Sequence, residues 1–283
     1  MGTVALNGLF VGLVAIYRSS RIINFAYGET GMLAAFVFFD VWLGRSRAGL
    51  GSGLGLVAAL AVALVVGAAI GASMELVIAR PLRDNPTLNG MVGTIAAGLL
   101  VLTFAFHRWG ADARPTKPLV GGSGVKLLGL TVSPSQLLIA ACTLVVLGAL
   151  GAVYRFTSVG LRIRANAMDP YAAALVGVNT NRTAMGAWAV AGALSALSAI
   201  LIAPLVAMNV LFMTVLGLRG FASALIGGLT SLGGAFLAGV LLGVLESVIA
   251  FKSPVSGITD VVIALGILLL MVVRPGGLFR ADY

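Results

Sequence analysis

The stretch LGLVAALAVALVVGAAIGASMELVIA, residues 54–79, contains one charged residue, Glu75. A helix needs about 20 consecutive apolar residues to cross a bilayer, and this stretch exceeds that length. The rest of the chain is similar, because 60% of its 283 residues are hydrophobic and only 10% are charged. We therefore predict an all-α, polytopic membrane helical bundle that forms a single transmembrane domain over residues 1–283. A transmembrane β-barrel would alternate apolar and polar residues in short segments, and this sequence does not.

Apolar runs recur along the chain and set the expected number of helices. The first two runs are short, and the run at 210–228 contains Arg219, so these three depart from an ordinary span. We expect about eight or nine transmembrane helices, of which one or two are broken or re-entrant. The runs cover residues 4–17, 30–43, 54–79, 88–106, 134–153, 184–206, 210–228, 233–251 and 258–273.

Glycines spaced four residues apart indicate how the helices pack. Such pairs lie on one face of a helix and let a neighbouring helix approach closely. They predict a tight bundle and carry no information about a substrate. The pairs are Gly8/Gly12, Gly67/Gly71 and Gly239/Gly243.

The segment at 155–183 is polar and basic, in contrast to the rest of the chain. Loops rich in arginine lie on the cytoplasmic side of a membrane, so we expect a cytoplasmic loop here. Alternation of the spans then places Arg80 and Arg83 on the same side. The 107–133 stretch, rich in proline and glycine, is expected to be an external loop. The arginines of the cytoplasmic loop are Arg155, Arg162, Arg164 and Arg182.

A short helix is predicted inside the basic loop, from about Asp169 to Gly177. Aspartate caps helix N-termini and proline suits the first helical turn, which describes Asp169 and Pro170. The following Ala-Ala-Ala-Leu at 172–175 has high helix propensity. Gly177 is well placed to end the helix.

Two interrupted segments resemble each other weakly and are candidates for a substrate path. Residues 21–29 read RIINFAYGE, and residues 219–234 read RGFASALIGGLTSLGG. Transporters build their paths from broken helices at matching positions of two repeats, where exposed N–H groups meet anionic substrate groups. The alternative is an ordinary loop with a turn. The first segment is the stronger candidate, because Asn24, Tyr27 and Glu29 crowd polar groups between two spans.

Three carboxylates fall in or beside apolar runs: Glu75, Glu246 and Asp260. Charged groups inside a membrane are costly and by default indicate function. Glu75 lies near Arg80 at a helix end and Asp260 near an interface, which favours structural roles for both. Glu246 lies farthest inside an apolar run, so it either lines a path or forms a packing hydrogen bond.

The sequence predicts a non-catalytic protein without a cofactor or metal site. It contains one histidine and one cysteine, Cys142, so neither a Ser-His-Asp nor a Cys-His set is possible. No Gly-x-x-x-x-Gly-Lys-[Ser/Thr] phosphate loop occurs, so the chain is not itself an ATPase. The net charge of +9 indicates contacts with lipid headgroups and no nucleic-acid partner.

Six motifs, in order, resemble the permease subunits of branched-chain amino-acid ABC importers. RIINFAYGE at 21–29 is similar to the family's R-[VI]-I-N-F-A-H-G-E, with Tyr27 where the family usually carries His. The segment 221–235, FASALIGGLTSLGGA, resembles F-A-A-A-V-L-G-G-x-G-S-x-x-G-A, with Thr230 where Gly is frequent. The other matches are RPLR at 80–83, TIAAGL at 94–99, GLRIRANAMDPYAAALVGVN at 160–179 and RPGGLF at 274–279.

The resemblance implies partners, a location and site residues. It implies an importer subunit in the bacterial inner membrane that works with a second related permease, two cytoplasmic ABC ATPase subunits and an extracytoplasmic substrate-binding protein. The substrate-path candidates are Asn24, Phe25, Tyr27, Gly28, Glu29, Phe221, Gly227, Gly228 and Glu246. The ATPase-coupling candidates are Gly160, Arg162, Arg164, Asp169, Pro170, Ala172, Ala173, Ala174 and Gly177.

Two other interpretations stay open at the level of sequence. One is a self-sufficient channel or secondary carrier for a small polar solute such as urea or an amide. The other is a membrane-embedded assembly subunit without a path of its own. The basic loop separates the importer from the carrier, because a carrier has no need of a helix that meets an ATPase.

Overall fold

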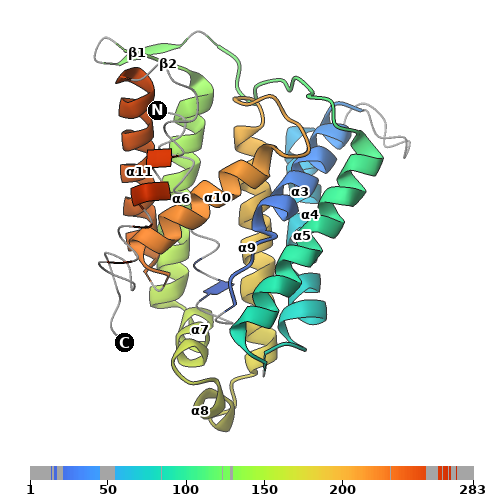
Figure 1. Ribbon diagram of the computed structural model, residues 1–283, viewed down its shortest axis with the longest axis vertical. Coiled ribbons are helices and arrows are strands. Elements are labelled where there is room, and N and C mark those ends of the chain that lie inside the picture. The colour runs from blue at the N-terminus through green and yellow to red at the C-terminus, as the bar shows by residue number, and fades with distance from the viewer. Residues whose placement is uncertain are drawn as a thin grey trace.

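The computed structural model describes residues 22–44, 55–83, 85–122, 124–127, 130–229 and 231–252, with isolated positions at 14, 16, 17, 261, 262, 264–266, 268 and 272. Helices dominate these residues (Figure 1), which confirms the predicted fold class. They are α3 (Tyr27–Trp42), α4 (Leu56–Met74) with a π-helical turn η2 (Glu75–Ala79), α5 (Thr87–Trp109), α6 (Pro134–Phe156), α7 (Ser158–Met168), α8 (Pro170–Leu175), α9 (Thr180–Ile202), α10 (Phe212–Gly227) and α11 (Leu232–Lys252). Two short strands, β1 (Val125–Leu127) and β2 (Leu130–Val132), complete the order.

Seven of the predicted apolar runs become helices. Four helical segments are long and apolar enough to cross a membrane: Leu56–Ala79, Thr87–Trp109, Pro134–Phe156 and Thr180–Ile202. The helices α3 and α10, with 16 residues each, are shorter. The short run at 30–43 predicts this for α3, whereas the run at 210–228 stands out for Arg219 and not for its length. The runs at 4–17 and 258–273 lie outside the described residues, isolated positions apart, so the total number of spans stays a prediction.

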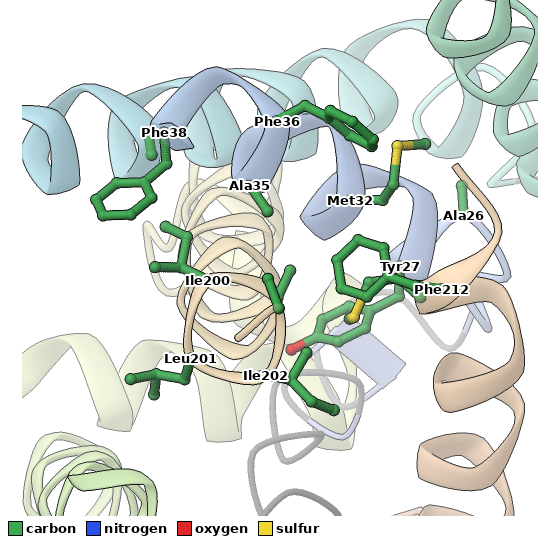
Figure 2. Packing of buried hydrophobic residues seen from close by; sticks show 14 of the residues in the cluster. Ala26, Tyr27, Met32, Ala35, Phe36, Phe38, Ile200, Leu201, Ile202 and Phe212 are labelled. Atoms are coloured by element: carbon green, nitrogen blue, oxygen red, sulfur yellow. The ribbon is translucent and has the colours of Figure 1, made fainter. Parts of the chain in front are cut away.

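Helix α3 is short because it lies inside the bundle. Phe36, Phe38 and Phe39 of α3 are fully buried. Figure 2 shows Ala35 and Phe38 of α3 on the side of Ile200 of α9. A helix surrounded by protein need not match the thickness of the hydrocarbon layer. The short run at 30–43 therefore forms the interior of the fold, whereas α4, α5 and α6 expose many apolar side chains on the outside.

Helices α4 and α9 cross at glycines. A Cβ atom placed on Gly67 would lie 2.6 Å from the carbonyl oxygen of Gly192, and one placed on Gly71 would lie 2.2 Å from that of Trp188. No side chain fits at such distances, so the close approach depends on glycine. The prediction from the Gly67/Gly71 pair is confirmed; Gly8 and Gly12 lie outside the described residues.

At each end of the bundle, a hydrogen bond joins two segments that are far apart in sequence. At one end, Arg83 donates a hydrogen bond of 2.8 Å to the side-chain oxygen of Asn181. At the other end, which also holds the antiparallel hairpin β1–β2, the N–H of Arg114 donates to the carbonyl of Met208 over 2.8 Å. Figure 1 shows the hairpin at the top and α7 and α8 at the bottom, so the stretches 107–133 and 155–183 lie at opposite ends.

Candidate functional site

The residues before α3 are held in a non-helical turn against α5. The side chain of Asn24 accepts a hydrogen bond of 2.9 Å from the N–H of Ala26. The hydroxyl of Thr94, on α5, accepts one of 3.2 Å from the N–H of Phe25. Both bonds satisfy buried backbone groups that a helix would otherwise satisfy. Within the interrupted segment predicted at 21–29, residues 22–26 are therefore non-helical and α3 begins at Tyr27. Arg21 lies outside the described residues.

The first turn of α3 is wedged between α9 and α10. A Cβ atom on Gly28 would lie 2.6 Å from the carbonyl oxygen of Met213 on α10, so only glycine permits this contact. On the opposite side, the hydroxyl of Ser195 on α9 donates to the carbonyl of Tyr27. The N–H groups of a first helical turn have no partner within the helix. Helix α3 thus presents the positive end of its dipole inside the bundle.

A small cavity of about 90 Å³ lies at this helix start. One wall is Glu29, whose side chain is 8% exposed and accepts a hydrogen bond of 3.0 Å from the hydroxyl of Thr214 on α10. The cavity is also lined by Phe25 and Phe221, whose ring centroids lie 5.3 Å apart. Within the described part of the chain, no ion pair involves Glu29. The lining residues are Asn24, Phe25, Tyr27, Gly28, Glu29, Thr214, Gly217, Leu218 and Phe221.

The cavity brings together six of the nine substrate-path candidates, Phe221 from the second interrupted segment included. Thr214, Gly217 and Leu218 also line the cavity and were not predicted from the sequence. Together with Phe221 these residues have the spacing i, i+3, i+4, i+7, which places them on one face of a helix. This periodicity in the sequence could have predicted that the four residues share a helix face. Only the fold shows that this face contacts the start of α3.

The other three path candidates do not line this cavity. Gly227 ends α10, where a Cβ atom would lie 2.3 Å from the backbone of Gly234, and Gly228 follows with φ of 91°. These two glycines lie at the tight turn that follows α10 and precedes α11. Glu246 is buried in α11, with its Oε1 3.7 Å from Nε of Arg219 on α10, so an ion pair joins these neighbouring helices.

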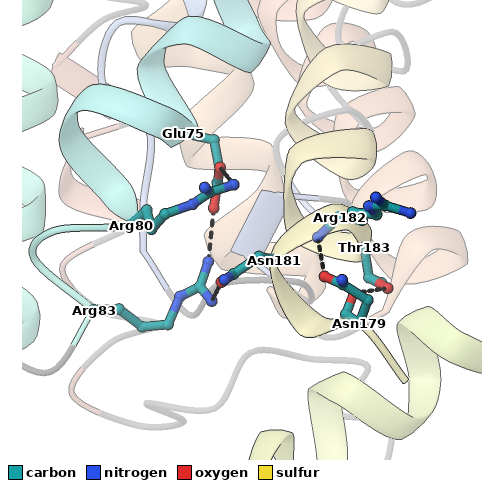
Figure 3. Close-up of polar contacts among 7 residues, drawn as sticks. All are labelled: Glu75, Arg80, Arg83, Asn179, Asn181, Arg182 and Thr183. Carbon is teal, nitrogen blue, oxygen red and sulfur yellow. Dashed lines mark hydrogen bonds and ion pairs between the residues drawn. The ribbon is translucent and has the colours of Figure 1, made fainter. Parts of the chain in front are cut away.

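Glu75 forms the centre of a polar cluster at the other end of α4. The carboxylate is fully buried and lies 3.2 Å from the guanidinium of Arg80 and 2.7 Å from that of Arg83. Arg83 extends to Asn181 on α9, as Figure 3 shows. The structural role predicted for Glu75 is confirmed by these contacts. Asp260, for which a role at an interface was predicted, lies outside the described residues.

The basic loop contains two helices, of which the sequence predicted one. Asp169 caps α8 by accepting hydrogen bonds from the N–H groups of Tyr171 (2.8 Å) and Ala172 (3.1 Å), and Pro170 begins the helix. Gly177 has φ of 86°, a conformation that glycine adopts most readily. The additional helix α7 begins at Ser158, where the hydroxyl of Thr157 accepts from the N–H of Gly160 (3.1 Å). A threonine that caps a helix start is a sequence signal that could have predicted α7.

Within this loop the coupling candidates differ in their surroundings. Gly160 is buried against α6, where a Cβ atom would lie 2.3 Å from the carbonyl oxygen of Val153. Ala173 is buried as well, whereas Ala172 and Ala174 are exposed. Arg162 is exposed and Arg164 is partly buried. Large apolar side chains of α7, α8 and the residue after α8 are also exposed, namely Leu161, Met168, Tyr171, Leu175 and Val176.

Comparison with known proteins identifies the family. The chain matches the family described as "Branched-chain amino acid transport system / permease component" over residues 5–272. The chain belongs to this family. The permease is 28% identical to the high-affinity branched-chain amino acid transport system permease protein LivH of Escherichia coli (strain K12), over 96% of this chain and 90% of that protein. It is 30% identical to the corresponding protein BraD of Pseudomonas aeruginosa, over 96% and 94%. No solved structure matches the permease.

Family membership confirms the resemblance inferred from the six motifs. It also supports a transport subunit over an enzyme and over a self-sufficient channel or carrier. The described residues contain no group of three His, Cys, Asp or Glu side chains that could hold a metal ion.

Proposed function

We propose that this permease forms part of the translocation path of an ATP-driven importer for branched-chain or related amino acids. The observation that carries this proposal is the cavity at the start of α3, where one buried carboxylate, the N-terminus of a helix and a pair of aromatic rings converge. The other path candidates, Gly227, Gly228 and Glu246, act by shaping the α10–α11 pair beside it.

The chemistry of the cavity suits a zwitterion with an apolar side chain. The carboxylate of Glu29 would pair with the α-ammonium group, since a buried charge needs a partner of opposite sign. The N-terminus of α3, where the helix dipole is positive, would meet the α-carboxylate. Phe25, Leu218 and Phe221 would surround an aliphatic side chain. Tyr27, which stands where the family usually carries His, lines the same cavity and would adjust the choice among related amino acids.

The cavity is too small for such a substrate in this conformation. Its volume of about 90 Å³ lies well below the roughly 300–1,000 Å³ of pockets that enclose drug-sized ligands. The rings of Phe25 and Phe221 narrow it. We expect α10 to move relative to α3 during transport, which separates the two rings and opens the path.

The basic loop is proposed as the contact with two cytoplasmic ABC ATPase subunits. Exposed apolar patches outside a membrane mark interaction sites, and the exposed side chains of α7 and α8 form such a patch. In this proposal Asp169, Pro170 and Gly177 fix α8, Ala172 and Ala174 contact the ATPase, and Gly160 and Ala173 hold the loop against α6 and α9. Arg162 and Arg164 add positive charge. A second related permease and an extracytoplasmic binding protein complete the complex in the bacterial inner membrane.

Purification followed by reconstitution tests the proposal. The tagged permease is isolated from its native membrane, its partners are identified by mass spectrometry, and the complex is placed in proteoliposomes. We expect two ATPase subunits and a second permease, and uptake of labelled leucine, isoleucine or valine that requires ATP and the binding protein. Flux of urea through the permease alone, without ATP, would instead show a channel or carrier.

A further inference from the structure

A second, larger cavity of about 610 Å³ lies at the end of the bundle that carries the basic loop. It is formed by the last two turns of α6, the first turns of α9, helix α7 and the turn that follows α8. None of the residues of the proposed substrate path contributes to it. The cavity therefore needs an explanation of its own.

The cavity has an apolar part and a cationic part, which lie at different depths along the spans. Leu150 and Val153 of α6 and Val190 of α9 line the part between the two membrane-spanning helices. Arg162 of α7 and Arg182 at the start of α9 line the part beside the loop. The apolar part thus lies within the depth of the spans, and the two arginines lie where the spans end.

The two arginines are not neutralised by the described residues. No carboxylate lines the cavity, and the ion pairs in the described part of the chain involve Glu75 and Glu246 only. Asp169, the acidic residue of the same loop, caps α8. Figure 3 shows the guanidinium of Arg182 turned away from the cluster around Glu75.

We propose that this cavity binds one anionic phospholipid of the adjacent leaflet, such as phosphatidylglycerol. Its phosphate would lie between Arg162 and Arg182, since basic pockets between transmembrane helices bind anionic headgroups and guanidinium groups pair with phosphate in bidentate fashion. One acyl chain would lie along the apolar part. The order of charge and apolar surface favours a lipid over a protein segment, because a phospholipid places its anionic phosphate where the spans end and its acyl chains within their depth. Arg162 would then bind the lipid phosphate and also contribute positive charge to the basic loop.

Native mass spectrometry of the purified complex, titrated with phosphatidylglycerol or phosphatidylethanolamine, tests this site. Two arginines contribute about 1 kcal/mol each toward an anionic lipid, so R162Q/R182Q should weaken phosphatidylglycerol binding about 30-fold. The matched control is R108Q/R155Q, which removes two exposed arginines outside the cavity and should leave binding unchanged. Binding of phosphatidylethanolamine should be weak in all three proteins.

Three outcomes would overturn the proposal. The first is equal phosphatidylglycerol binding by the wild type and R162Q/R182Q. The second is equal displacement of the lipid by inorganic phosphate at millimolar concentration, which would show an anion site without a role for the apolar part. The third is loss of the lipid whenever the ATPase subunits are bound, which would show that a protein occupies the cavity. Melting temperature and subunit composition, measured on each variant, separate these outcomes from misfolding and from failure of the proposed transport function.

Discussion

At the scale of single residues, Glu29 is the side chain with the most evident chemical role. Its carboxylate is buried inside a membrane protein, where charge is costly unless it is paired. The hydroxyl of Thr214 donates a hydrogen bond to this carboxylate, and Glu29 lines the cavity in which the proposed substrate would bind. Glu75 and Glu246, in contrast, have arginine partners. This difference supports the proposed role of Glu29 as a substrate contact, whereas Glu75 and Glu246 lie in ion pairs within the protein.

Replacing Glu29 by glutamine tests this assignment. The substitution keeps the shape and a hydrogen-bond acceptor but removes the charge. A hydrogen bond to a charged group contributes about 1.5–3 kcal/mol, so ATP-dependent amino-acid uptake should fall at least about tenfold at low substrate concentration. The complex should still assemble. Asp112→Asn, at an exposed carboxylate, is the control, and equal uptake by both variants would show that Glu29 is not a substrate contact.

At the scale of elements, the α4–α9 crossing shows how glycine sets helix distance. Gly71→Ala introduces a methyl group where only 2.2 Å separates its position from the carbonyl oxygen of Trp188. Overpacking typically costs about 1–3 kcal/mol, so the permease should unfold at a lower temperature in detergent. Gly148→Ala, on α6 with no atom within 4 Å, is the matched control and should be neutral or stabilising. Equal melting temperatures would contradict the close contact.

The helix α8 offers a second test at the same scale. Tyr171 and Leu175 are 76% and 73% exposed, so changing both to aspartate leaves the packing of the loop intact while removing the apolar surface. We expect ATPase subunits to be lost during purification of the variant, with membrane insertion unchanged. Changing buried Ala173 would not discriminate, because it would disrupt the loop itself. Retention of the ATPase subunits by Tyr171→Asp/Leu175→Asp would exclude α8 as the docking element.

At the scale of the whole molecule, the two ends of the bundle differ in the segments that connect the helices. One end holds the hairpin β1–β2 and the bond between Arg114 and Met208; the other holds α7, α8 and the cluster around Glu75. The contact between Arg83 and Asn181 joins two loops that the positive-inside rule assigns to the same side. This agreement supports the predicted orientation, with the arginine-rich end in the cytoplasm.

Single cysteines test the orientation directly. The native Cys142 is changed to Ser, and a cysteine is introduced at Lys117 or at Tyr171, both exposed. A membrane-impermeant thiol reagent applied to spheroplasts should label Lys117→Cys only. In inverted membrane vesicles it should label Tyr171→Cys only. The reverse pattern would invert the assignment of the two loops, and labelling of both positions from one side would contradict a bundle with these ends on opposite sides.

The sequence by itself determined the features that depend on neighbouring residues. Long apolar runs gave the membrane-spanning helices, Asp169 and Gly177 gave the limits of α8, and the polar residues of 21–29 gave the break before α3. The tertiary structure decided which distant groups meet: Thr214 with Glu29 across 185 positions, Arg219 with Glu246, and α3 in the interior. Caps and periodicity act within a few residues, whereas these contacts depend on how closely backbones approach, which glycines such as Gly28 and Gly67 permit only once the helices are packed.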